Sequence, residues 1–154
     1  MAFPGTTGVV VSIDTYDRGA GSVGNNPTIL PAKDIESVTF QLPNAKTVRV
    51  DGLAEVYEYM RKIGKWMMPD CQIVLRTDVV GGAPVAGSAY TILGRPEEAG
   101  HPTRTLTVAI ASGMSITWEV HQDTVTVDLP KDAVIMTTHN LKHANALAPV
   151  MVGF

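Results

Sequence analysis

Two histidines four positions apart are the first residues whose spacing could do chemistry. On a helix, His139 and His143 would share one face, as paired metal ligands do. Neither histidine belongs to an HExxH pattern, and the single cysteine, Cys71, is far from them in sequence. We therefore interpret both histidines as structural or surface residues, and we predict neither a bound metal nor a cofactor.

A literal GxGxxG stands at Gly19 to Gly24, directly after a predicted strand over residues 9–16. A dinucleotide site needs the last glycine to open a helix whose N-terminus holds the pyrophosphate. Here Asn25, Asn26 and Pro27 follow, and no amphipathic helix comes after them. We interpret residues 17–33 as a mobile loop, and a loop of this length in a small domain is often functional.

Other catalytic signatures are absent from the sequence. There is no GxSxG elbow, Walker loop, kinase motif set or CxxC pair. The acidic residues are scattered, with Glu97 and Glu98 in a predicted loop, so no carboxylate pair suggests acid–base catalysis. Cys71 begins a predicted strand and is interpreted as a small buried hydrophobic residue. These observations predict a protein that is not an enzyme.

Composition narrows the class further. A chain of 154 residues fits one domain, and 14 glycines and 10 prolines with 18% charged residues fit a β-rich fold with many turns. The formal net charge is -3 without a basic run, which argues against sequence-specific nucleic-acid binding. No signal peptide pattern and no apolar run of about 18 residues is found, so we expect no membrane and folding in a cytoplasm.

The most regular helical pattern lies at residues 52–68, between predicted strands at 46–50 and 71–78. Asp51 is a good N-cap, and Pro69 would end the helix. One face would carry the apolar residues Leu53, Val56, Tyr57, Met60, Ile63 and Met67. Tyr59 and Trp66 fall on the border of this face. They would either flank the core or anchor another subunit, since aromatic residues contribute much of the energy of interfaces.

The remaining segments predict strands. Alternating apolar residues mark 9–16, 35–42, 88–93, 104–111, 114–120, 124–129 and 134–138. The expected fold is mainly β: an antiparallel β-sandwich or barrel with one flanking α-helix at about 52–68, in a single domain over 1–154. The expected core consists of Leu53, Val56, Met60, Ile63, Ile73, Leu75, Leu106, Val108, Ile116 and Trp118. Uncharged threonines dominate the other strand faces, which favours contact with further copies of the chain.

Two segments are expected to contact neighbouring subunits. The loop at 17–33 carries Val23, Ile29 and Leu30, which gain about 25 cal/mol per Å² when their apolar surface is buried. The C-terminal tail at 140–154 carries Leu147, Val150, Met151 and Phe154. This tail would pack either on its own domain or on a neighbour, and the sequence does not choose between the two.

The order of hairpin, helix, central strand, long loop and meander resembles the tail-tube proteins of bacteriophages and of contractile injection machines. The segments that carry the resemblance are 47–50, 53–67, 72–77, 90–93 and 103–111. It implies a structural subunit of the virion, assembled in the host cytoplasm, that forms stacked hexameric rings of identical copies and contacts other virion proteins. A capsid decoration protein is the nearest alternative, and a small ligand-binding module or an enzyme without a recognisable motif is a further one.

Overall fold

A computed structural model describes residues 8–17, 22–50, 59–77, 79–80, 83–94, 103–131, 134–144 and 147–154. Within these ranges the fold is mainly β, and the strand pairs are antiparallel, as the sequence predicts. The elements in chain order are β1 (Val10–Asp17), β2 (Ser22–Ile29), the 3₁₀ turn η2 (Ala32–Asp34), β3 (Ile35–Thr39), β4 (Asn44–Val50), β5 (Tyr59–Met67), β6 (Cys71–Thr77), β7 (Val79–Val80), β8 (Ala83–Pro84), α1 (Ala89–Leu93), β9 (Arg104–Ala111), β10 (Met114–Asp128), β11 (Ile135–His143) and β12 (Val150–Val152).

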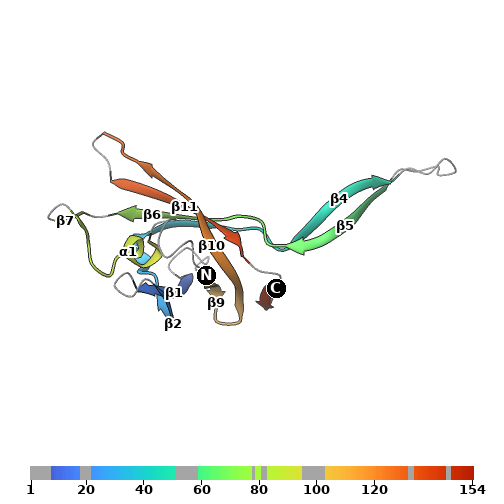
Figure 1. Ribbon diagram of the computed structural model, residues 1–154, viewed down its shortest axis with the longest axis horizontal. Helices are drawn as coiled ribbons and strands as arrows, with labels where there is room; N and C mark the ends of the chain where they lie inside the picture. The colour runs from blue at the N-terminus through green and yellow to red at the C-terminus, as the bar shows by residue number, and fades with distance from the viewer. Residues whose placement is uncertain are drawn as a thin grey trace, which may run out of the picture.

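One large sheet forms the body of the molecule, with the strand order β2-β1-β9-β10-β11-β6-β3. The long strand β10 connects its parts (Figure 1). The first half of β10 pairs with β9 on one side and with β12 on the other, and its second half pairs with β11. Strands β4 and β5 pair only with each other among the described strands, and form a separate two-stranded ribbon.

The core lies against one face of this sheet, because alternate residues of its central strands point inward. In β6 the inward positions begin at Cys71, and in β10 they include Ile116 and Trp118. Six of the predicted core residues are buried: Ile73, Leu75, Leu106, Val108, Ile116 and Trp118. The strand periodicity therefore identified this part of the core correctly.

The predicted helix at 52–68 is wrong over residues 59–67, which form strand β5. In this ribbon Thr47 pairs with Lys62 and Val50 pairs with Tyr59. Gly64 disfavours a helix by about 1 kcal/mol relative to alanine, and aromatic and β-branched residues such as Tyr59 and Ile63 favour strands. Met60 is 61% exposed, so the predicted core position is also wrong there. Leu53 and Val56 lie outside the described residues.

The predicted strand at 88–93 is wrong: the short helix α1 occupies most of these residues. The carboxylate of buried Asp34 accepts a hydrogen bond of 3.0 Å from the backbone N–H of Ala89. Gly94 follows the helix with φ of 75°, a conformation that glycine adopts without strain, and its N–H bonds the carbonyl of Tyr90. No helix in the described ranges has the length and apolar character needed to cross a membrane.

The predicted mobile loop at 17–33 contains a strand, since β2 pairs with β1 along residues 22–29. Pro27 lies opposite Asp14 in this pairing, and the register shifts between Asp14 and Tyr16. Proline cannot donate a hydrogen bond to a neighbouring strand, so sheets accept it mainly at edges and bulges. Strand β2 is the first strand of the sheet, which is why a segment rich in glycine, asparagine and proline is tolerated there.

The C-terminal segment folds back onto its own subunit through β12. Ser115 pairs with Val152 and Thr117 with Val150, while residues 140–143 belong to β11. Gly153 has φ of 76° and lies directly against the turn between β9 and β10, where a Cβ atom would come within 2.1 Å of the Gly113 carbonyl oxygen. The close approach of the Gly153 and Gly113 backbones thus holds the C-terminal segment against the turn.

We predict that Gly153→Ala displaces β12 from β10. The added methyl group has no space and the positive φ is strained, so the free energy of unfolding should fall by about 1 kcal/mol or more. Hydrogen exchange at Val150 and Val152 measures the effect directly. Gly113→Ala is the matched control, because a Cβ at Gly113 meets nothing within 4 Å. Equal exchange in the two variants would show that this contact does not hold the strand.

Candidate assembly surfaces

The ribbon of β4 and β5, called the arm from here on, projects away from the body of the molecule (Figure 1). A two-stranded ribbon gains little stability by itself in water, because neither of its faces is covered. Of its described side chains, Met60, Trp66 and Met67 are more than half exposed and are therefore accessible to other molecules. The foot of the arm is fixed to the body by Ala45 and Met68, which are 4% and 1% exposed.

The surface of the arm combines apolar and basic side chains. Met60, Trp66 and Met67 are 61%, 60% and 57% exposed. The Lys62 ammonium lies 5.1 Å from the centre of the Trp66 ring, a cation–π contact worth about 0.5–1 kcal/mol at an exposed site. The two strands contain no acidic residue but five basic ones, which are Lys46, Arg49, Arg61, Lys62 and Lys65. Met60 and Trp66 share one face of β5 and Met67 lies on the other, so the arm is a candidate interaction surface.

The C-terminal segment forms a second exposed apolar surface. The backbone of β12 is paired with β10, yet Val150, Met151 and Val152 are 64%, 45% and 52% exposed. Phe154 is 44% and Leu147 is 71% exposed. Pairing within the subunit thus holds the backbone of this segment and leaves its side chains uncovered.

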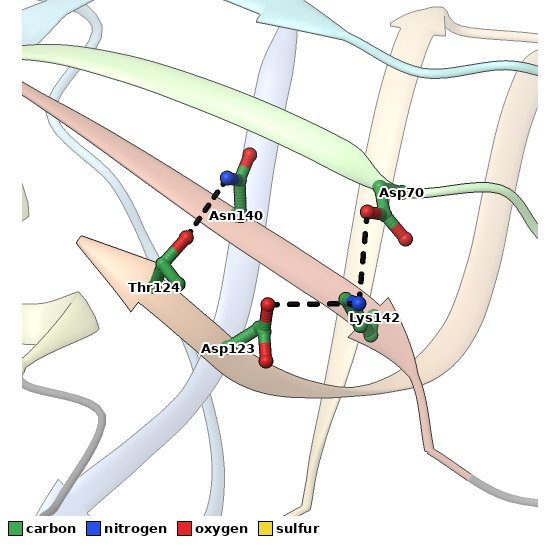
Figure 2. A network of polar contacts seen from close by, with 5 residues as sticks. All are labelled: Asp70, Asp123, Thr124, Asn140 and Lys142. Atoms are coloured by element: carbon green, nitrogen blue, oxygen red, sulfur yellow. Dashed lines mark hydrogen bonds and ion pairs between the residues drawn. The ribbon is translucent and has the colours of Figure 1, made fainter. Parts of the chain in front are cut away.

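A network of polar contacts joins side chains of β10 and β11 to Asp70, which precedes β6 (Figure 2). The Lys142 ammonium lies 3.6 Å from a carboxylate oxygen of Asp123 and 4.0 Å from one of Asp70. The Asn140 amide donates a hydrogen bond of 2.9 Å to Thr124. Because all three charged side chains are about half exposed, each ion pair contributes no more than about 1 kcal/mol.

A second polar network is buried beneath α1. The Arg104 guanidinium donates hydrogen bonds to the carbonyls of Ile92 and Leu93 at the end of the helix, and to the Gln122 side-chain oxygen at 3.3 Å. The Gln122 amide nitrogen donates to the Gly94 carbonyl at 3.1 Å and lies 2.9 Å from Nδ1 of His139. This network satisfies the carbonyls that a helix end leaves unpaired.

The hydrogen bonds of His139 determine its tautomer. Its Nδ1 faces an amide nitrogen that can only donate, so Nδ1 accepts and the proton lies on Nε2, 3.0 Å from the Thr137 hydroxyl. Burial, with a smaller contribution from the Arg104 charge, lowers the pKa of His139 to about 4. Protonation would place a second donor against the Gln122 amide. The folded state therefore holds this histidine neutral.

An apolar pocket of about 180 Å³ opens between β9, the segment from η2 through β3, and the residue before β1. Its lining is formed by Val9, Ala32, Ile35, Val38, Phe40, Val108 and Ile110. No group of three histidine, cysteine, aspartate or glutamate side chains in the described part of the chain is placed to hold a metal ion. Cys71 is fully buried, and burial raises the pKa of its thiol to about 12.

The predicted contact residues fall into three groups in the structure. Trp66 on the arm, Ile29 on β2, and Leu147, Val150, Met151 and Phe154 in the C-terminal segment are exposed. Leu30 is 1% exposed and packs into the core of its own subunit, so its side chain is not available to a neighbour. Tyr59 lies at the start of β5 and Val23 in β2, but their side chains lie outside what the structure describes.

Two features of these surfaces were not predicted from the sequence. The helical pattern placed Met60 and Met67 on the buried face of a helix, although both are exposed on the arm. The contacts of His143 at the foot of the arm were also missed. Gly64 and the concentration of basic residues in 46–65 were the signals that could have indicated an exposed ribbon.

Comparison with known proteins gives a similarity of fold alone. No protein-family model matches the chain, and no curated protein matches its sequence. A chain in the tail of an empty GTA particle with C6 symmetry aligns with a TM-score of 0.59 and 13% identity, covering 99% of this chain and 100% of that one.

Two further structures are similar over almost their whole length. A chain of the 6-fold symmetrised baseplate of the anti-feeding prophage has a TM-score of 0.56 and 14% identity, with 99% of this chain and 98% of that one covered. A chain from the sheath/tube terminator structure of PVC, an extracellular contractile injection system, has a TM-score of 0.53 and 11% identity, with 98% and 97% covered. The chain thus has the fold found in components of phage-like tail particles, as the resemblance in its sequence implied.

We predict that acid destabilises the protein through His139. A histidine whose pKa is lowered by folding stabilises the native state above its unfolded pKa of 6.5 and loses this contribution as the pH falls towards 4. Between pH 7.5 and pH 5 this one group should reduce the free energy of unfolding by about 2 kcal/mol. Urea melts at the two pH values measure the change. His139→Gln is the control, because glutamine does not titrate, and its free energy of unfolding should fall by correspondingly less between the two pH values. An equal fall in the variant would assign the acid sensitivity to other groups.

We predict that Cys71 does not react in the native protein. Its thiol is buried and its pKa is raised to about 12, whereas the thiolate is the reactive form. Iodoacetamide at pH 8 should leave the native chain unmodified in intact-mass spectra and add one group after denaturation in urea. Modification of the native chain at the rate of the denatured chain would contradict the buried placement.

Proposed function

We propose that this chain is a non-enzymatic structural subunit of a phage-like tail particle, most specifically a tube subunit that assembles with copies of itself into stacked, six-fold rings. The observation that carries the proposal is a fold shared over 97% or more of each chain with three components of such particles. The symmetry stated for two of those structures, C6 and 6-fold, supports the ring of six. The particle is then assembled in the host cytoplasm and includes other virion proteins.

The exposed apolar surfaces support contacts between copies. A monomer that remained alone would leave Met60, Trp66 and Met67 in water on the arm, and Val150, Met151 and Phe154 in water at the C-terminus. Burying such side chains contributes a gross stabilisation of about 25 cal/mol per Å² of apolar area, from which the entropy lost on association is subtracted, and a ring repeats every contact at each subunit. We infer that both surfaces dock on neighbouring copies, with Ile29 on β2 as a further contact.

A ligand-binding module is the second candidate function. The apolar pocket of about 180 Å³ near β1 and β3 is the observation that favours it. Pockets of known small-molecule sites are larger, about 300–1,000 Å³, and include a few polar groups that orient the ligand. This pocket is small, and its lining residues are all apolar, which makes the assembly function the better-supported proposal.

The assembly function predicts that the double variant Met60→Ser, Trp66→Ser stays folded but no longer assembles. Both side chains are more than half exposed, so their loss should change the free energy of unfolding by less than about 1 kcal/mol. Electron microscopy of purified protein should show rings or tubes for the parent chain and dispersed subunits for the variant. Thr47→Ser, also on the arm, is the matched control and should assemble normally.

Other outcomes of the same experiment would redirect the assignment. Oligomers that bind capsids and never stack would indicate a capsid decoration protein. Dispersed monomers in every preparation of the parent chain, together with saturable binding of a small apolar molecule, would favour the ligand-binding module.

A further inference from the structure

The two exposed surfaces meet at one place, the foot of the arm. Strand β5 ends at Met67, and the next residue, Met68, is 1% exposed and packs in the core cluster. The end of β11 lies beside it, and the chain then continues from β11 to Leu147 and β12. Residues of β11 therefore lie between the arm and the C-terminal segment.

His143, the last residue of β11, contacts both of these elements. The backbone N–H of Met68 donates to its Nδ1 at 3.3 Å, and its Nε2 donates to the backbone carbonyl of Leu147 at 3.0 Å. Both partners are backbone groups with fixed roles, one a donor and one an acceptor. Only a neutral ring with its proton on Nε2 makes both bonds. The His143 side chain thus joins Met68 to Leu147, and these two hydrogen bonds fix the orientation of its ring.

The neighbouring residue strengthens the attachment of the foot from the outside. Lys142 lies within ion-pair distance of Asp70, just after the arm, and of Asp123 on β10 (Figure 2). The exposed Lys142 side chain contacts Asp70 at the foot of the arm, but it makes no described contact with the C-terminal segment. Lys142 therefore provides a matched comparison for His143: both hold the foot, and only His143 also holds Leu147.

We propose that His143 is a positioning residue that couples the direction of the arm to the seating of β12. Leu147 lies three residues before the start of β12, with Pro149 in between, and Gly153 follows that strand and lies against the turn at Gly113. A neighbouring copy that binds the arm would then change the position of β12, and one that binds β12 would change the direction of the arm. This use in assembly rests on the proposed function, whereas the coupling itself is a property of the single subunit.

The coupling can be measured in the unassembled subunit with spin labels. Thr47→Cys places one label on the arm and Gln72→Cys places the other on β6, and both positions are exposed. The buried Cys71 remains unlabelled under native conditions. Pulsed dipolar spectroscopy then gives the distribution of distances between arm and body, and its width reports how firmly the arm is held.

Releasing the C-terminal strand provides the test. With His143 present, Gly153→Ala should broaden the arm distribution roughly twofold. In the His143→Ala background the distribution should already be broad, and Gly153→Ala should add nothing. Lys142→Ala should leave the response to Gly153→Ala in place. An arm distribution unchanged by Gly153→Ala in the parent background would overturn the proposal, provided that hydrogen exchange shows β12 released.

Two conservative variants separate the two bonds and guard against general unfolding. Asparagine can present an acceptor near the position of Nδ1, so His143→Asn should keep the arm distribution narrow but abolish its response to Gly153→Ala. Glutamine can reach the Leu147 carbonyl but offers no acceptor at Nδ1, so His143→Gln should broaden the distribution. Identical behaviour of both variants, with normal melts, would argue that the side chain only fills space.

The coupling and the proposed function fail separately. Absence of coupling in a subunit that still forms tubes would refute the role of His143 alone. Intact coupling in a subunit that never assembles would refute the proposed function alone. If both hold, His143→Ala should slow tube formation several-fold, as followed by light scattering, without lowering the free energy of unfolding to the same degree as a core truncation.

Discussion

The backbone hydrogen bonds of β10 are the interaction on which the rest of the structure depends. This one strand of 15 residues pairs with β9, β12 and β11, so it fixes the register of the main sheet and of the C-terminal segment together. A slip of one residue would turn Ile116 and Trp118 outward and Thr117 inward, because side chains alternate between faces. Burial of the apolar set specifies the register strongly, and the positions of the exposed surfaces follow from it.

The sequence was sufficient where a single face is buried. The alternation of Leu106, Val108, Ile116 and Trp118 with polar residues predicted both the strands and the core, since the apolar face of a strand must pack against the protein interior. The same reasoning failed for the arm, because exposed apolar residues such as Met60 and Trp66 are not constrained to alternate by packing against a core. The spacing of Met60, Ile63 and Met67 matched a helix, but these residues belong to strand β5, and Met60 and Met67 are exposed, while the side chain of Ile63 lies outside what the structure describes.

Contacts distant in sequence explain the remaining differences. Helix α1 is capped at its start by Asp34, 55 residues earlier, and at its end by Arg104 from the next strand. Neither residue stands at a local capping position, so propensity within 88–93 favoured a strand. His139 and His143 drew attention as a pair four apart, yet on a strand this spacing is about 13 Å, and each serves a different network. Composition marked the apolar residues of the C-terminal segment but left open whether they pack on their own chain or on a neighbour, and the pairing of β12 with β10 shows that the backbone is held within the chain.

Proline at position 27 affects how one edge of the main sheet can meet other extended chains. An open sheet edge presents unpaired N–H and C=O groups, with which any extended chain nearby can pair. Strand β2 stands at one end of the main sheet, with Pro27 and a bulged register against β1. A strand with a missing N–H and an irregular backbone is a poor template for indiscriminate β-aggregation. This edge therefore disfavours the strand-by-strand addition of further chains by which fibrils grow.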